Sequence, residues 1–272
     1  MLFDAVPARS FNRISSRQNP HVAQYRAAAQ GELIDTLLLD GPHLVGDALA
    51  AGIPLEHAAV VSTAVDREDI KALTAELERI GVETVVATPQ VMAAMSPVRS
   101  SSAIVALGRR PVPDATRLYA GSAPLAIIAS DVQDPGNLGA IVRAAEAGSA
   151  TSVIAAGACA DPFSWKALRG SAGSALRLPI GLAGDAAAAI DESRRHGCRV
   201  IALVPRGGRS LYEIDLTRAT AMLIGGEGPG LDQALIERAD ERVTIPMHAP
   251  VESLNAAVAA AIVVYEALRQ RT

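Results

Sequence analysis

Three short segments carry polar side chains of the kinds that bind a charged substrate and stabilise a reacting oxygen. Each follows a run of apolar residues that is typical of a buried strand. The segments are NLGAIVR from Asn137 to Arg143, GGEGPGL from Gly225 to Leu231, and the Ile245, Pro246, Met247 turn followed by Ser253, Leu254 and Asn255. Of these polar groups, the guanidinium of Arg143 could hold a phosphate and an oxygen on which charge develops.

The elements around these segments must bring them to one place. Three apolar runs predict strands: 125–129, 221–225 and 242–245. Apolar residues at helical spacing predict helices over 137–147 and 254–270, with Ser253 as the N-cap of the second. This order of strands and helices predicts an α/β fold with a mostly parallel sheet. Sites in such sheets lie at the carboxyl ends of the strands.

The glycine-rich turn after residue 224 excludes the commonest nucleotide motifs. Residues 226–231 read GEGPGL and not GxGxxG, and no GK[ST] follows any glycine-rich turn. Glycines let the main chain approach a ligand closely or adopt a positive φ. At this turn a ligand could therefore come close to the main chain.

These three motifs, in this order over the last 150 residues or so, resemble those of the SpoU (TrmH) family of RNA ribose 2′-O-methyltransferases. That family belongs to the SPOUT superfamily. The resemblance implies a SPOUT domain with a trefoil knot, S-adenosylmethionine bound in the knot, and a homodimer formed through the C-terminal helix. A knot is a feature that periodicity alone does not predict.

The resemblance also implies roles for particular residues. The implied catalytic residues are Arg143, Asn137, Glu227, Ser253 and Asn255. The implied cofactor-binding residues are Leu203, Gly225, Gly226, Glu227, Ile245, Met247 and Leu254. Each polar residue has a structural alternative: Asn137 a helix cap, Arg143 a surface ion pair, and the other three a loop contact.

The role of Arg143 has two versions. The family's proposal has Arg143 assist deprotonation of the 2′-hydroxyl, but a guanidinium stays charged in essentially every protein environment. A clamp on phosphate and developing oxyanion is the physically easier role.

The N-terminal part alternates strands with helices and predicts a smaller α/β domain over residues 1–107. Its predicted strands include Leu33 to Leu39. It resembles the L30e-like substrate-recognition domain of many SpoU enzymes through short segments such as DGPHLV, which begins at residue 40. Residues 108–124 have the proline and glycine content of a linker, and 125–272 form the SPOUT domain. A further strand is predicted at 177–180.

Candidate RNA-binding residues lie in two regions. The first 30 residues hold four arginines, Arg13 and Arg17 among them, and one acid. The other region, Phe163 to Arg177, carries Lys166 and Arg169 and resembles the family's segment beside the active site. The net charge of −4 argues mildly against a nucleic-acid binder. Because basic and acidic residues are concentrated in different parts of the sequence, a local phosphate-binding face is still possible. The alternative for the terminal arginines is a solvated tail.

Composition favours a cytoplasmic protein without a metal. The two cysteines, Cys159 and Cys198, are far apart and show no spacing with histidine that supports zinc or a disulfide framework. The five histidines show no clustering and receive no role. The longest apolar run, Ala256 to Tyr265, is too short to span a bilayer.

We therefore expect an S-adenosylmethionine-dependent RNA 2′-O-methyltransferase, with ribosomal RNA (23S-type) favoured over transfer RNA. A tRNA 2′-O-methyltransferase is the nearest alternative. A non-catalytic RNA-binding or ribosome assembly factor that kept the knotted fold is an alternative of another class.

Overall fold

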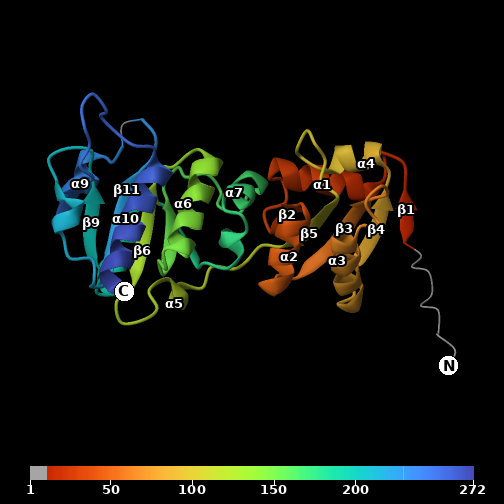
Figure 1. The fold of residues 1–272 in the computed structure, drawn as a ribbon, viewed down its shortest axis with the longest axis horizontal. Helices are drawn as coiled ribbons and strands as arrows, with labels where there is room; N and C mark the ends of the chain where they lie inside the picture. Colours follow the sequence, from red (N-terminus) through yellow and green to blue (C-terminus); the bar gives the residue numbers. More distant parts are fainter. Residues whose placement is uncertain (1–10, 229) are drawn as a thin grey trace. The chain divides into compact units, whose positions relative to one another are not determined.

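The computed structural model describes residues 11–228 and 230–272 (Figure 1). The chain divides into two compact units, Met1–Arg110 and Pro111–Thr272. Each unit is an α/β structure with a sheet of its own, which confirms the predicted fold class. Within the described residues, no helix combines the length and apolar character needed to cross a membrane.

The first unit holds a five-stranded mixed sheet in the order β1-β4-β3-β5-β2. Its strands are β1 (Asn12–Ile14), β2 (Thr36–Asp40), β3 (Leu55–Val61), β4 (Glu83–Ala87) and β5 (Ile104–Arg109). Its helices are α1 (Pro20–Gln30), α2 (Pro42–Ala50), α3 (Glu68–Arg79) and α4 (Pro89–Met95). Strand β2 begins later than predicted because the Thr36 amide donates to the Leu33 carbonyl in a turn. Strand β1, which pairs in parallel with β4, was not predicted.

The second unit holds a seven-stranded sheet in the order β10-β12-β9-β11-β6-β7-β8, and every neighbouring pair is parallel. Its strands are β6 (Leu125–Ser130), β7 (Ser152–Ala156), β8 (Ile180–Ala183), β9 (Arg199–Leu203), β10 (Arg209–Ser210), β11 (Thr220–Gly225) and β12 (Glu241–Thr244). Its α-helices are α5 (Ala115–Leu118), α6 (Pro135–Ala147), α7 (Trp165–Gly170), α8 (Ala186–Arg195), α9 (Gln233–Arg238) and α10 (Ala256–Arg271). The prediction of a mostly parallel sheet is confirmed.

Helices cover both faces of this sheet. Ile128, Leu223 and Val200 form one core cluster with Ile190 of α8. Because side chains alternate along a strand, the intervening Ile127 and Met222 face the opposite side, where α6 packs against α7 and α10 (Figure 1). Strands buried on both faces explain why the strand sequences are continuously apolar.

Two local predictions in this unit are wrong. Residues predicted as a strand from 177 to 180 follow a 3-10 turn (Ser174–Leu176), and β8 starts only at Ile180, since Arg177 points to an ion pair with Glu146. The N-cap of α10 is Asn255 and not Ser253, because the Asn255 Oδ1 accepts from the Ala257 and Val258 amides.

The region with linker composition contains a short helix. Helix α5 lies at residues 115–118 and its Leu118 is part of the core of the second unit. The Leu118 carbonyl also accepts from the Ser152 hydroxyl at 2.7 Å. The end of this region is therefore tied to the sheet by packing and by a buried hydrogen bond.

Glu266 of α10 gives the second unit a pH-dependent contribution to stability. Hydrogen bonds from Arg269 lower the pKa of the Glu266 carboxyl from 4.5 to about 2. A pKa lowered by folding contributes stability above the unfolded value, and this is lost as pH falls through the folded one. We expect Glu266→Gln to melt below wild type at neutral pH, and the difference to shrink between about pH 5 and pH 2. Thermal denaturation across this range checks it; a constant difference would contradict it.

Candidate functional site

The three polar segments meet at the carboxyl ends of β6, β11 and β12. Asp134 caps α6 by accepting from the Asn137 amide at 2.8 Å, so Asn137 lies in the first turn and is not the cap. The Asn137 Nδ2 donates to a Glu227 carboxylate oxygen, and the Asn137 Oδ1 accepts from Asn255 Nδ2 at 3.0 Å. Residues from three separate segments of the sequence thus form one hydrogen-bonded chain.

The orientation of this chain is set by α10. Since the Asn255 Oδ1 is occupied by the amides of Ala257 (2.9 Å) and Val258 (3.3 Å), only its Nδ2 is left to donate to Asn137. Asn137 must then present its own Nδ2 to Glu227, which accepts as a carboxylate. The first turn of a helix therefore determines which way two amides and a carboxylate point.

We expect two substitutions of Asn255 to separate its two roles. Asn255→Asp keeps an acceptor for α10 but loses the donor to Asn137. Melting temperature should therefore stay near wild type, while the RNA methylation expected from the three motifs falls. Asn255→Ala removes the cap as well and should cost about 1 kcal/mol of unfolding free energy. Calorimetry and an RNA methylation assay on both variants check this. Full activity in Asn255→Asp would contradict it.

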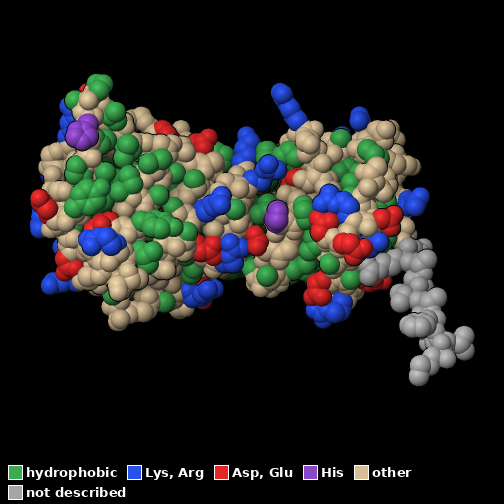
Figure 2. Space-filling model, in the orientation of Figure 1, with side chains coloured by type: hydrophobic (Ala, Val, Ile, Leu, Met, Phe, Trp, Pro, Cys, Tyr) green, Lys and Arg blue, Asp and Glu red, His purple; other side chains and the backbone are tan. Residues whose placement is uncertain are grey.

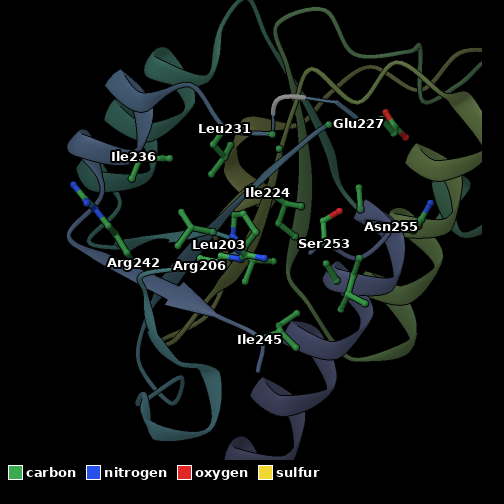
Figure 3. A pocket seen from close by; sticks show the side chains of 18 of the residues that line it. Leu203, Arg206, Ile224, Glu227, Leu231, Ile236, Arg242, Ile245, Ser253 and Asn255 are labelled. Atoms are coloured by element: carbon green, nitrogen blue, oxygen red, sulfur yellow. The ribbon is translucent and has the colours of Figure 1, made fainter. Parts of the chain in front are cut away.

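A cavity of about 640 Å³ opens beside the hydrogen-bonded side chains of Glu227 and Asn255 (Figure 3). That volume is within the usual range for sites that bind small molecules and cofactors. The loops after β9, β11 and β12 and the start of α10 supply its walls. All seven predicted cofactor-binding residues line it: Leu203, Gly225, Gly226, Glu227, Ile245, Met247 and Leu254. Ser253 and Asn255 line it too.

The glycines of this cavity are required by close packing of the main chain. A Cβ on Gly225 would lie 2.5 Å from the Gly230 carbonyl carbon, and a Cβ on Gly226 would lie 2.1 Å from the Asp131 carbonyl oxygen. Gly228 and Gly230 have positive φ, which glycine adopts without strain. The turn therefore presents bare backbone to the cavity, and the residues present fit a ligand bound by main-chain groups between apolar walls.

Arg143 lies on α6 outside the walls of the cavity and is exposed. Among residues 11–228 and 230–272 its guanidinium has no hydrogen-bond or ion-pair partner. The alternative of a structural surface ion pair thus finds no support within that part of the chain. An exposed guanidinium with no partner in the described part of the chain is available for a phosphate or an oxyanion.

The candidate RNA-binding residues lie in both units. In the second unit, Lys166 and Arg169 are exposed on α7, and the Lys166 Nζ lies 5.6 Å from the centre of the half-buried Trp165 ring. In the first unit, Arg13 is exposed on β1. Arg17 donates through its Nε to the Gln90 carbonyl at 3.3 Å.

Asp131, directly after β6, is a residue at this site that sequence reasoning missed. It has a positive φ of 57°, which is rare outside glycine. Its carboxylate accepts from the Ser130 hydroxyl (3.0 Å) and the Ala158 amide (2.8 Å), and its carbonyl lies against Gly226. The signal available was its position immediately after a buried strand.

A second missed cluster lies in the first unit. The rings of His21 and His57 stack with centroids 4.0 Å apart, although 36 positions separate them. The Tyr25 hydroxyl lies 2.9 Å from the His57 Nδ1, and burial lowers the pKa of His57 to about 4. His21, His57 and Glu83 form a group of potential metal ligands. Sequence spacing gave no indication of this group.

Comparison with known proteins identifies the family. The model described as "SpoU rRNA Methylase family" matches residues 124–265, which span all three segments and the cavity. The chain belongs to this SpoU family. The resemblance predicted from the three motifs is confirmed.

Relatives of this SpoU chain extend over both units. It is 35% identical to an uncharacterized tRNA/rRNA methyltransferase of Synechocystis, covering 95% of this chain and 94% of that one. It is 30% identical to the Bacillus subtilis 23S rRNA (guanosine(2553)-2′-O)-methyltransferase RlmP, covering 85% and 88%. Among solved structures, the AdoMet-bound rRNA methyltransferase of Sinorhizobium meliloti is 26% identical with a TM-score of 0.84, covering 95% and 98%.

Proposed function

We propose that this SpoU protein transfers a methyl group from S-adenosylmethionine to a ribose 2′-hydroxyl of ribosomal RNA. The observation that carries the proposal is the hydrogen-bonded chain of Asn137, Glu227 and Asn255 at the edge of a glycine-lined cavity. Arg143 lies on the same helix as Asn137, and its guanidinium has no partner among the residues that the structure describes. The 2′-O-methylation of 23S rRNA by RlmP supports the reaction and the substrate class. The AdoMet bound to the Sinorhizobium meliloti enzyme supports the cofactor.

The chain's own residues would do the following. The seven cavity residues would hold the adenosyl part, which supplies an activated methyl group when bound. Arg143 would clamp the RNA phosphate and stabilise charge on the 2′-oxygen as its proton leaves, since its guanidinium cannot serve as a base at neutral pH. Glu227, held by Asn137, would orient groups on the RNA side. Ser253 would contact the substrate from the cavity wall.

RNA contacts would come from both units. Lys166 and Arg169 would bind phosphates beside the site, and Arg13 and Arg17 would do so on the first unit. We propose that this first unit, with the linker 108–124, is an L30e-like recognition domain. The coverage of RlmP over 85% of this chain supports a shared role for it.

We further propose a homodimer and a trefoil knot. Figure 2 shows hydrophobic side chains gathered over α10, where Val258 and Tyr265 are about half exposed at 49% and 52%. An apolar helix face of this kind favours a second copy as its partner. The insertion of β11 between β6 and β9 supports the threading that the family implies. An enzyme that modifies ribosomal RNA would act in the cytoplasm.

Labelling of RNA tests the proposal. Purified protein is incubated with methyl-labelled S-adenosylmethionine and either ribosomal or transfer RNA that lacks modification, and the product is hydrolysed with alkali. We expect label in ribosomal RNA at a linkage that resists alkali, because a 2′-O-methyl group blocks cleavage. Label on a base would refute the ribose assignment, and label in tRNA alone would favour the tRNA enzyme. Cofactor binding without label in either RNA would favour an assembly factor.

A further inference from the structure

The cavity contains a cationic side chain that the proposed function leaves without a role. Arg206 lies in the loop after β9 and lines the cavity. Figure 3 shows its side chain close to that of Leu203, with Ile224 of β11 and Ser253 nearby. Its side chain is largely exposed, so an anionic group that enters the cavity could reach the guanidinium.

Arg206 is the cation best placed to meet a ligand. The charged residues lining the cavity, among those the structure describes, are Arg206, Glu227 and Arg242. Figure 3 shows Arg242 extending away from the cavity, and Glu227 is on another side, where Asn137 binds it. A negatively charged group in the cavity therefore finds its counter-ion in Arg206.

The present partner of Arg206 is weakly held. One guanidinium nitrogen of Arg206 lies 3.1 Å from the Glu252 Oε1. Both side chains are largely exposed, at 72% for Arg206 and 78% for Glu252. Exposed ion pairs of this kind contribute about 0–1 kcal/mol to stability. Within residues 11–228 and 230–272, the rest of the guanidinium makes no hydrogen bond. A ligand anion could therefore replace Glu252 at little cost.

We propose that Arg206 binds the α-carboxylate of the methionyl part of the cofactor. This inference rests on the proposed function. The carboxylate is the single anionic group of S-adenosylmethionine, and the planar guanidinium matches a carboxylate through two parallel hydrogen bonds. The amino-acid end of the ligand lies at Arg206, and the apolar residues Leu203 and Ile245 are left for the nucleoside. An RNA phosphate is the competing partner.

Ligand binding in the absence of RNA tests the assignment. Calorimetric titrations compare S-adenosylhomocysteine with 5′-methylthioadenosine, which has the same thioether nucleoside without the amino acid. We expect wild type to prefer S-adenosylhomocysteine, and Arg206→Gln to bind it about ten- to a hundred-fold more weakly, the usual effect of one charged hydrogen-bonded contact. Affinity for 5′-methylthioadenosine should stay unchanged.

Two matched variants complete the experiment. Arg242→Gln removes a cation that lines the same cavity but points away, and should leave both affinities unchanged. Glu252→Gln removes the competing carboxylate and should leave S-adenosylhomocysteine binding equal or tighter. The assignment would be overturned if Arg206→Gln bound both ligands with wild-type affinity, or if it lost affinity for both equally. The proposed function would still stand. A separate RNA-binding titration covers the competing partner: if Arg206→Gln loses affinity for RNA alone, Arg206 binds an RNA phosphate. A wild type that binds neither ligand would overturn both proposals.

Discussion

Arg143→Ala is expected to lower the rate of RNA methylation by about 10²- to 10³-fold, the usual effect of removing one group that stabilises a developing oxyanion. Because Arg143 is exposed and has no partner among the described residues, the melting temperature and cofactor affinity should stay those of wild type. Single-turnover methylation of ribosomal RNA measures the rate, and calorimetry measures the other two quantities.

Arg143→Lys is the matched control. Lysine keeps the charge but lacks the planar fork, so its activity should lie between those of wild type and Arg143→Ala. A rate for Arg143→Ala within a few-fold of wild type would remove Arg143 from the reaction. A loss of activity accompanied by a lower melting temperature would instead give Arg143 a structural role.

Gly139→Ala is expected to lower the free energy of unfolding by about 1–3 kcal/mol, as overpacking of a close contact usually does. Gly139 is buried on α6, where a Cβ would lie 2.5 Å from the Ala167 carbonyl oxygen and 2.8 Å from the Ser171 amide nitrogen. Both atoms are main-chain atoms of α7 or the residue after it, so helix α7 has to move. Because α7 carries Lys166 and Arg169, RNA affinity should fall as well.

Denaturant unfolding and an RNA-binding titration check this prediction. Gly184→Ala is the control in the same unit. Apart from its two neighbours in sequence, no described residue has an atom within 4 Å of its Cβ position, and its φ is ordinary. This control should leave the free energy of unfolding and the affinity for RNA near those of wild type. Equal stability of the two variants would contradict the close packing of α6 on α7.

Sequence could predict the meeting of the three segments because one rule governs it. Parallel strands end at a common edge, so Asn137, Glu227 and Asn255 had to lie near one another once their strands were recognised. The seven cofactor-binding residues came instead from the resemblance to the SpoU family. Continuous apolar runs such as 125–129 were sufficient to predict the buried strands.

Details that depend on contacts between distant residues could not be predicted. Ser253 and Asn255 are both good N-caps, and the choice depends on where the loop from Met247 places the first turn. The stacking of His21 on His57 and the place of Arg206 in the cavity depend on tertiary structure. Strand β1 is short and carries exposed residues, so only its pairing with β4 reveals it.

The capping of α10 by Asn255 means that motion and reactivity are linked at this site. Whenever thermal fraying frees the amides of Ala257 and Val258, the Asn255 side chain can rotate, and Glu227 loses its alignment two hydrogen bonds away. If these residues act as proposed, the lifetime of this helical turn would limit how often an encounter with RNA finds Asn137 and Glu227 aligned. A cofactor molecule bound against Asn255 would lengthen that lifetime, so cofactor binding would favour the later binding of RNA.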